Sequence, residues 1–478
     1  MDAPIPWRIE DLLAATGGTL VAGPKTAMFY GIGIDSRTIR RDQVFVAIKG
    51  QRYDGHGFIP ELMEAGIKGI IIHQPLPDHQ QLVKWSEAGG CCIMVEDTTR
   101  ALGDLAAFQR RRAKIPLVAI TGSNGKTTTR ELTAAILNRC KPTLCTEGNL
   151  NNEIGVPLTL FRLRGSHEAA VVELGMNHPD EIRRLAEICQ PDIGVITNVG
   201  PAHLEGLKDI ERIMAAKAEL LEYIPVFGAA VLNADEEFGT RLAGMAKSRV
   251  IYFGTAGKAD VRAEAVRQAG MATEFNLILP ESQIPVTLHA PGRYMLANAL
   301  AAAAVGYAMG VSGEAIKAGI ETFSPVPGRM AHTETGTGIH VIDDAYNANP
   351  GSMKAAIEAL AVLKEGSRAF LVAGDMLELG EAAAELHHDV GRAAAAAGID
   401  RLYVTGTFAQ DMADGALSGG MPSTAVFVGD KSGIFEKLSQ ELTPGDWVLV
   451  KGSRSTGMEQ FVQHLSRNGS LKDRGARV

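Results

Sequence analysis

The residues with the clearest chemical potential form a glycine-rich segment, TGSNGKTTT, at positions 121–129. A loop that carries Gly122 and Gly125 lets backbone N–H groups close around phosphate oxygens, and the helix expected to begin near Gly125 adds the positive end of its dipole. Lys126 would then reach the terminal phosphates of a nucleotide, and the Thr127 hydroxyl would hold Mg²⁺. The segment therefore predicts a nucleotide-binding phosphate loop.

The flanking residues favour this interpretation, although the match to the general P-loop pattern is incomplete. The apolar run LVAI before the loop predicts a buried strand, and Leu132 and Ile136 share one face of the helix expected after it. The position five residues before Gly125 is Ile120, where the general pattern has glycine, so the loop is a shortened form. The alternative is a glycine-containing turn with an exposed lysine. The threonine after Lys126 and the preceding strand favour the phosphate loop.

Side chains near later strands predict a metal site beside the nucleotide. Mg²⁺ takes oxygen donors and substrate phosphates, so Thr127 and Glu173, the latter in the run AAVVEL, form a suitable pair. His203, in NVGPAHLEG, is a candidate ligand for a second metal ion. Lys217, in MAAKAELL, is a candidate for a carbamate formed with CO₂, which would offer two oxygens to that ion. A surface glutamate, a structural histidine and a solvated lysine stay open as alternatives.

Polar residues also follow three expected strands in the last third of the chain. DDAYNANPGSM, VKGSR and GDMLELG each continue from an apolar run. Turns explain such residues one by one. The carboxyl ends of parallel strands, however, meet at one edge of a sheet, where ligands bind, and the cations of VKGSR are suited to hold a carboxylate. The pattern predicts a binding edge that includes Asp344, Asn347, Asn349, Lys451, Ser453 and Arg454.

The elements that must position these residues alternate between strand and helix patterns, and 478 residues are too many for one core. The first of three expected domains is a small α/β domain, in which a loop with Ser36 and Arg37 could hold an anionic ligand; a solvated loop explains these two residues equally well. The second is a doubly wound parallel sheet with an antiparallel extension at 260–290, and the third is another open α/β sheet after FSPVPGRM. The predicted bounds are 1–113, 114–325 and 326–478.

The composition argues against several classes of function. The formal net charge of −8 and the pI near 5.9 argue against a broad nucleic-acid-binding surface, because such surfaces are basic. The start, MDAPIPWRIEDLL, lacks the basic and apolar regions of a leader, and no apolar run reaches the roughly 18 residues of a membrane span. The five cysteines show no metal-ligand spacing, which is typical of structural thiols in a reducing cytosol. We expect a cytoplasmic protein without membrane insertion.

Taken together, the motifs resemble those of the Mur ligases of peptidoglycan synthesis, along nearly the whole chain. The phosphate loop alone would fit any amide-forming ligase of this superfamily. The combination of ELGMNHP with DDAYNANP is much more specific. It resembles the motifs of the branch of the family that adds D-Ala-D-Ala. The resemblance rests on DSRTI, DGHGF, TGSNGKTTT, GNLNNEIGVPLTL, ELGMNHPDEI, NVGPAHLEG, PGR with NALAAA, PGRM, DDAYNANPGSM, GDMLELG and VKGSR.

The resemblance implies a fold and a reaction. The expected fold has an N-terminal α/β domain for a UDP-sugar, a central P-loop ATPase domain, and a C-terminal Rossmann-like domain that closes over the site. In the expected reaction the γ-phosphoryl group of ATP converts the carboxylate of UDP-N-acetylmuramoyl-tripeptide into an acyl phosphate, which the amine of D-Ala-D-Ala then attacks. The expected cofactors are ATP and two Mg²⁺ ions, and the expected assembly is a monomer.

The resemblance also implies a role for each matching residue. Lys126, Glu173, His203 and Lys217 form the expected catalytic set: Thr127 and Glu173 would hold one Mg²⁺, and His203 with carbamylated Lys217 the second. The family usually has His-Asn where this chain has Tyr294 and Met295, which leaves the adenine contacts open. The expected nucleotide-binding residues are Thr121, Gly122, Ser123, Asn124, Gly125, Lys126, Thr127, Thr128, Asn298, Arg329 and Asp344. The expected substrate-binding residues are Ser36, Arg37, Asn151, Asn152, Asn347, Asn349, Lys451, Ser453 and Arg454.

Rival functions share part of this signature. Folylpolyglutamate synthase and other Mur ligases share the loop and the lysine, but DDAYNANP and VKGSR favour the dipeptide-adding branch. A P-loop NTPase that serves as a switch or motor is a rival from another class, and phosphate release that depends on both substrates would eliminate it. A pure binding module is a third alternative. It would not explain why a phosphate loop, a carboxylate suited to a metal ion and a further α/β domain occur together.

Overall fold

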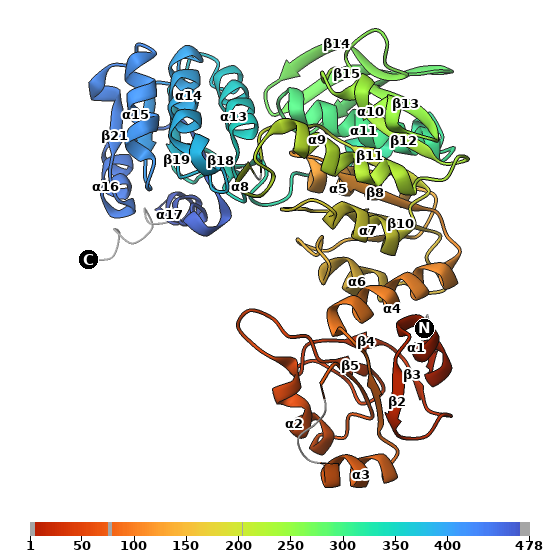
Figure 1. Ribbon diagram of the computed structural model, residues 1–478. Coiled ribbons are helices and arrows are strands. Elements are labelled where there is room, and N and C mark those ends of the chain that lie inside the picture. The colour runs from red at the N-terminus through yellow and green to blue at the C-terminus, as the bar shows by residue number, and fades with distance from the viewer. Residues whose placement is uncertain (1–4, 75–78, 203, 469–478) are drawn as a thin grey trace, which may run out of the picture.

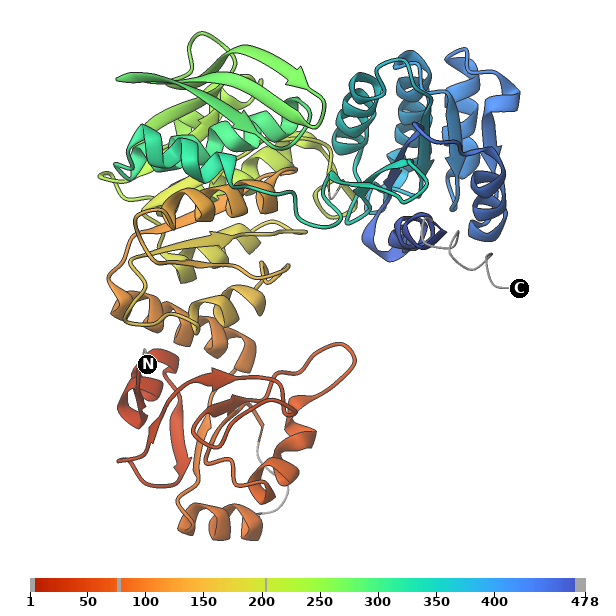
Figure 2. The same ribbon diagram turned by 180° about the vertical axis from the view of Figure 1, so that it is seen from behind.

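The computed structural model describes residues 5–74, 79–202 and 204–468 and contains three α/β units along the chain. In Figures 1 and 2 the N-terminal unit, red to orange, lies at one end of the central unit, and the blue C-terminal unit lies beside the central unit. Each unit has its own main sheet, most of whose strands are parallel, so the expected α/β fold class is confirmed. Within the described residues, no helix is long and apolar enough to cross a membrane.

The N-terminal unit contains a five-stranded sheet in the order β2 (Thr19–Ala22), β7 (Cys91–Met94), β6 (Gly69–Ile72), β5 (Val44–Val46) and β4 (Ile32–Gly33). Strands β4 to β7 are parallel, and β2 is antiparallel to β7. A ribbon of β1 (Trp7–Arg8) and β3 (Met28–Phe29) lies beside it. The helices are α1 (Ile9–Thr16), α2 (Ile59–Glu64), α3 (His79–Glu87) and α4 (Thr98–Ala113).

The central unit contains nine strands in the order β16-β15-β14-β13-β12-β11-β8-β10-β9. Strands β8 to β13 are parallel, and β14 to β16 form the antiparallel extension expected at 260–290. The strands are β8 (Leu117–Thr121), β9 (Thr143–Cys145), β10 (Ala169–Glu173), β11 (Ile193–Ile196), β12 (Ala229–Asn233), β13 (Arg249–Gly254), β14 (Val261–Ala269), β15 (Ala272–Leu279) and β16 (Ser282–Leu288). The α-helices are α5 (Lys126–Leu137), α6 (Gly155–Leu160), α7 (Glu181–Cys189), α8 (Leu204–Leu207), α9 (Ile210–Ala218), α10 (Gly239–Met245), α11 (Arg293–Ala308) and α12 (Gly313–Glu321).

The central sheet is buried on both faces, because neighbouring residues of a strand point to opposite sides. In β8, Val118 and Ile120 pack in the core that α5 and α11 cover, whereas Leu117 and Ala119 pack in the core that α7 covers. A strand buried on both faces is apolar throughout, which is the reason that the run LVAI predicts it. Because both faces of β8 are packed, its carboxyl end has a fixed position, and the phosphate loop begins there.

The C-terminal unit contains a six-stranded sheet in the order β17-β18-β22-β19-β20-β21, in which the pair of β17 and β18 is antiparallel and the other neighbours are parallel. The three strands with the polar ends, β18, β22 and β19, are neighbours, so the sequence correctly predicts that these ends share one edge. The strands are β17 (Ala331–Glu334), β18 (His340–Asp344), β19 (Ala369–Ala373), β20 (Arg401–Val404), β21 (Val426–Val428) and β22 (Trp447–Lys451). The α-helices are α13 (Pro350–Leu363), α14 (Ala383–Ala396), α15 (Ala409–Ser418), α16 (Lys431–Glu441) and α17 (Glu459–Asn468).

Candidate active site

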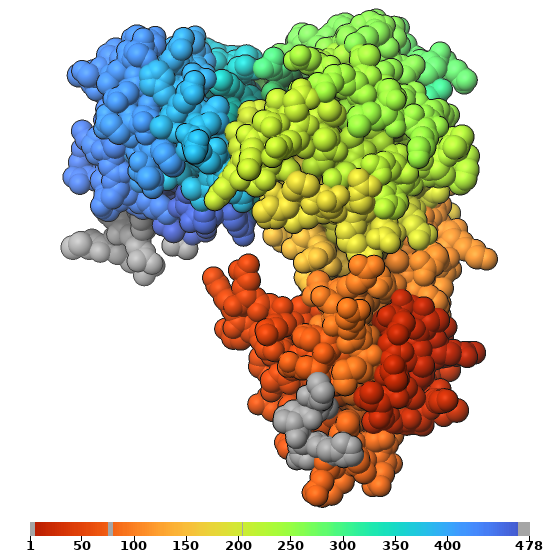
Figure 3. Space-filling model, in the orientation of Figure 1, coloured from red at the N-terminus to blue at the C-terminus, as the bar shows by residue number. Residues whose placement is uncertain are grey.

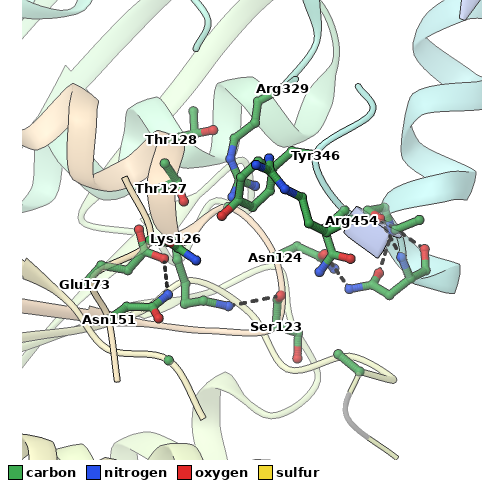
Figure 4. Close-up of a pocket in the computed structure, with 18 of the residues that line it drawn as sticks. Ser123, Asn124, Lys126, Thr127, Thr128, Asn151, Glu173, Arg329, Tyr346 and Arg454 are labelled. Carbon is green, nitrogen blue, oxygen red and sulfur yellow. Dashed lines mark hydrogen bonds between the residues drawn. The ribbon is translucent and has the colours of Figure 1, made fainter. Parts of the chain in front are cut away.

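A cavity of about 950 Å³ lies between the central and C-terminal units. Its wall includes the phosphate loop, the carboxyl end of β10, the start of α11, the connection before β17 and the polar edge of the C-terminal sheet. Figure 3 shows the blue C-terminal unit lying against the central unit, and Figure 4 shows side chains from both units facing the cavity. The phosphate loop and the polar edge of the C-terminal sheet, which the sequence predicts separately, thus line the same cavity.

The phosphate loop requires glycine at two positions. Gly122 and Gly125 have φ angles of 147° and 80°, which side chains rarely adopt. A Cβ atom on Gly122 would lie 1.9 Å from the Thr197 hydroxyl, and one on Gly125 would lie 2.1 Å from Asn298 Oδ1. Asn298 is therefore packed directly against the loop, where it also accepts a 3.3 Å hydrogen bond from the Thr129 hydroxyl.

Residues after β11 anchor the other side of the loop. The pattern IGVITNV predicts a strand to residue 199, but β11 ends at Ile196 because the next side chains turn toward the phosphate loop. The Thr197 hydroxyl donates to the Asn124 carbonyl (2.6 Å), and the Asn124 N–H donates to Asn198 Oδ1 (2.8 Å). The Ser123 hydroxyl donates to the Gly200 carbonyl (2.8 Å). These hydrogen bonds hold the shape of the phosphate loop.

Lys126 begins α5 and lies inside the loop, where its ammonium donates to the Gly122 carbonyl (2.7 Å). Burial lowers the pKa of Lys126, while the charge of Glu173 raises it and that of Arg329 lowers it further. Thr127 and Thr128, the next residues of α5, are buried and also line the cavity. At the base of the loop, the buried Thr121 hydroxyl has no hydrogen-bond partner within the described residues.

Glu173, at the end of β10, is held by a buried network. Its side chain is 3% exposed and forms a 3.1 Å ion pair with Arg130, which is 2% exposed. Asn151 Nδ2 donates to the second carboxylate oxygen (2.9 Å), and Arg130 also donates to the Gly148 carbonyl (2.9 Å). Sequence reasoning missed Arg130. Its position four residues after Lys126 on one helix was the available signal, because such residues share a face.

Part of the expected metal-binding set lies in the cavity wall. Thr127 and Glu173 line it together, and a hydroxyl with a carboxylate fits the oxygen donors that Mg²⁺ takes. His203 lies outside the described residues. Lys217, on α9, is 1% exposed; burial lowers the pKa of its ammonium well below the usual range, and the charge of Lys126 lowers it further. Within the described part of the chain, no group of three or more His, Cys, Asp and Glu side chains could hold a metal ion.

On the opposite wall, a buried ion pair joins the ends of β18 and β22. Lys451 donates to Asp344 (2.6 Å) and to the Asn347 carbonyl (2.9 Å), and the Met330 N–H also donates to Asp344 (3.1 Å). Burial raises the pKa of Asp344, against the opposing effect of Lys451 and then of Arg329. Lys451 is 2% exposed, so its charge acts mainly on Asp344.

The same wall makes a direct contact with the phosphate loop. Asn349 caps α13, since its side chain accepts from the Ser352 N–H (2.9 Å), and its Nδ2 donates to Asn124 Oδ1 (2.7 Å). The Ser453 hydroxyl accepts from the Leu377 N–H (2.9 Å) and so joins the ends of β22 and β19. The C-terminal unit therefore touches the loop that is expected to hold the nucleotide.

On the C-terminal wall of the cavity, Arg329 and Arg454 both pack against the ring of Tyr346, a residue that sequence reasoning missed. The guanidinium carbon of Arg329 lies 4.2 Å from the ring centroid of Tyr346, and that of Arg454 lies 4.9 Å from it. Figure 4 shows both arginines converging on Tyr346. Its place in DDAYNANP, two residues after Asp344, was the signal that could have found it.

Other predicted residues have different surroundings. Ser36 and Arg37 lie in the N-terminal unit, outside this cavity wall, and Arg37 is paired with Asp35 (2.7 Å). Asn152 lines the cavity, but its side chain also accepts from the Gly155 N–H (2.8 Å) at the start of α6. Tyr294 and Met295, where the sequence departs from the family pattern, lie in the wall beside Asn298.

Comparison with known proteins agrees with this geometry. Three family descriptions match: "Mur ligase family, catalytic domain" at residues 28–110, "Mur ligase middle domain" at 120–306, and "Mur ligase, glutamate ligase domain" at 328–454. A UDP-N-acetylmuramoyl-tripeptide–D-alanyl-D-alanine ligase of Escherichia coli is 39% identical over 91% of this chain and 93% of its own length. The chain belongs to the Mur ligase family.

Solved structures of other Mur ligases have the same fold. A crystal structure of MurF from Acinetobacter baumannii has a TM-score of 0.88 and 33% identity, covering 97% of this chain and 99% of that one. A MurF ligase from Thermotoga maritima in complex with ADP has a TM-score of 0.80 and 28% identity, covering 92% of this chain and 98% of that one.

Proposed function

We propose that this chain joins D-Ala-D-Ala to UDP-N-acetylmuramoyl-tripeptide, with ATP as the energy source, and so makes UDP-N-acetylmuramoyl-pentapeptide for peptidoglycan synthesis. One observation carries the proposal: a phosphate loop and the polar strand edge of a second unit line the same cavity. An amide-forming ligase needs both, because phosphoryl transfer and attack by the amine occur at one carboxylate. The names and near-complete coverage of the relatives from Escherichia coli and Bacillus subtilis support the choice of substrates.

The chemistry follows from charge. A carboxylate resists attack because it is negative and its leaving group would be oxide. A carboxylate oxygen of the tripeptide therefore attacks the γ-phosphorus of ATP, the bond to ADP breaks, and an acyl phosphate forms. The amine of D-Ala-D-Ala then attacks the acyl carbon, phosphate leaves with the bonding electron pair, and the amine loses a proton. Exclusion of water protects the acyl phosphate from hydrolysis.

The residues of the central unit would stabilise the transferring phosphoryl group, which is the main requirement of such reactions. The N–H groups at the start of α5 and the ammonium of Lys126 would bind the phosphates. A Mg²⁺ ion held by Thr127 and Glu173 would supply further charge stabilisation. Lys217 would carry a carbamate: burial lowers the pKa of its ammonium, which favours the neutral amine that can add CO₂. The carbamate would serve a second ion together with His203.

The remaining assignments complete the proposal. The proposed domains are a UDP-sugar-binding domain at 1–113, an ATP-binding domain at 114–325 and a Rossmann-like ligase domain at 326–478, and the protein would act as a cytoplasmic monomer. Lys451, at the substrate edge, pairs with Asp344, a proposed nucleotide contact, and so holds the two binding regions next to each other. Nucleotide contacts also come from Thr121, Gly122, Ser123, Asn124, Gly125, Thr128, Asn298, Arg329 and Asp344. Substrate contacts come from Ser36, Arg37, Asn151, Asn152, Asn347, Asn349, Ser453 and Arg454.

An assay of ADP release, with the product mass checked, tests the proposal. We expect release to require both UDP-N-acetylmuramoyl-tripeptide and D-Ala-D-Ala, and the product to be the pentapeptide. We expect Lys126→Ala to abolish ligation while the variant stays folded, as judged by its circular dichroism spectrum. ADP release that is independent of the dipeptide would instead indicate an NTPase of another class, and normal ligation by Lys126→Ala would contradict its role.

A further inference from the structure

Tyr346 connects two arginines that come from different parts of the chain. Arg329 lies in the connection before β17, Tyr346 follows β18, and Arg454 follows β22. The two guanidinium carbons lie 4.2 and 4.9 Å from one ring centroid, which is cation–π range, and Figure 4 shows all three side chains at the cavity. They can be no farther apart than the sum of these distances, about 9 Å.

The ring is held in place through its backbone. The Tyr346 N–H donates to the Gly328 carbonyl (3.1 Å). Gly328 has a φ of 80°, and a Cβ atom added there would lie 3.0 Å from Tyr346 Cβ, so the two segments are in close contact. Gly328 directly precedes Arg329. One backbone contact therefore fixes both the ring and the first cation.

The charges of the two arginines are available to an anion. Among the residues that the structure describes, no carboxylate forms an ion pair with Arg329 or Arg454, and both side chains line the cavity. Arg329 is near enough to Lys126 for its charge to lower the pKa of that lysine. Arg329 therefore lies toward the phosphate loop. Arg454 follows β22, is exposed, and lies against the same ring.

We propose that Tyr346 is a positioning residue that keeps the two guanidiniums at a set separation, with Arg329 toward the nucleotide phosphates and Arg454 at the carboxylate of the incoming dipeptide. The inference rests on the proposed function and adds to it the means by which the dipeptide is oriented. Its amine must reach the acyl phosphate while its carboxylate is held elsewhere. An extended dipeptide spans about 7 Å, which is comparable with the upper limit between the two cations.

The chemistry of Arg454 suits this role. A guanidinium binds a carboxylate through two parallel N–H donors, which fixes orientation as well as position. An arginine without a nearby aromatic surface would have many rotamers to lose on binding, whereas one already packed on a ring has fewer. Tyr346 would thus lower the entropic cost of binding the dipeptide without touching the reacting atoms.

The test compares D-Ala-D-Ala with D-alanyl-D-alaninamide, in which a neutral amide replaces the carboxylate. The quantity measured is the ratio of kcat/KM for the two acceptors. We expect the wild type to prefer the carboxylate by tenfold or more, on the order expected for a charge-assisted pair. We expect Arg454→Gln and Tyr346→Leu to reduce this preference toward unity. Tyr346→Phe, the matched control, keeps the ring and should keep the preference.

Folding and nucleotide binding are followed separately. Melting temperatures of the variants identify any that fail to fold, and titration with a non-hydrolysable ATP analogue reports the nucleotide site. A wild type that uses both acceptors equally well overturns the inference. The inference also fails if folded Arg454→Gln and Tyr346→Leu keep the preference for the carboxylate acceptor but bind the ATP analogue more weakly. The anion at Arg454 would then be a phosphate of the nucleotide. If no pentapeptide forms from the natural substrates, the proposed function itself fails.

Discussion

Replacing Arg130 with methionine should lower the free energy of unfolding of the central unit by about 3 kcal/mol. The change leaves the carboxylate of Glu173, which is 3% exposed, without its ion-pair partner, and breaking a buried pair costs roughly 3–5 kcal/mol. The lower end of this range applies for two reasons. Asn151 still donates to Glu173, and the substitution removes the buried Arg130 Nε, which has no partner within the described residues.

Urea unfolding followed by far-ultraviolet circular dichroism measures this loss, in the transition that belongs to the central unit. The control is the double variant Arg130→Met with Glu173→Gln, which removes the orphaned charge and should recover about 2 kcal/mol, within the usual range of coupling energies. Arg130→Lys keeps the charge and should lose less than Arg130→Met. Stability of Arg130→Met within about 0.5 kcal/mol of the wild type, or no recovery in the double variant, would refute the reasoning.

Three further predictions concern the loop, the contact between units and a buried histidine. Gly125→Ala should weaken nucleotide binding at least about tenfold in calorimetric titration, because the left-handed backbone and the collision with Asn298 both oppose the loop; an unchanged Kd would contradict this. Asn349→Ser keeps a helix-capping oxygen but is too short to reach Asn124, so ligation should slow severalfold, on the order of one lost hydrogen bond, while hydrogen exchange in α13 stays unchanged. Burial lowers the pKa of His387, so its neutral form stabilises the fold above about pH 6.5, and this stability is lost as the pH falls from there toward the native pKa. We expect the urea midpoint of the wild type to fall as the pH is lowered from about 6.5, because the unfolded chain then binds a proton at this histidine before the native protein does. An equal fall in His387→Gln would show that another group is responsible.

The sequence alone determined what depends on neighbours along the chain. The phosphate loop was predictable because a buried strand, two glycines, a lysine and a helix start occupy one short segment, and Gly122 and Gly125 do have the positive φ angles that such a loop needs. The shared edge of the C-terminal sheet was predictable because parallel strands place their carboxyl ends together. The antiparallel extension at 260–290 was predictable because this stretch is richer in strand-forming residues than its neighbours.

Tertiary structure alone decided which distant side chains satisfy one another. Arg130 and Glu173 are 43 positions apart, and Asn124 and Asn349 are 225 apart. No local pattern encodes such a pairing. Burial then changes what a residue can do: Lys451, which by sequence is a free cation for a substrate, is 2% exposed and bound to Asp344. The physical reason is that a charge removed from water must find its partner inside the fold, and only the packed arrangement of strands and helices determines which partner is within reach.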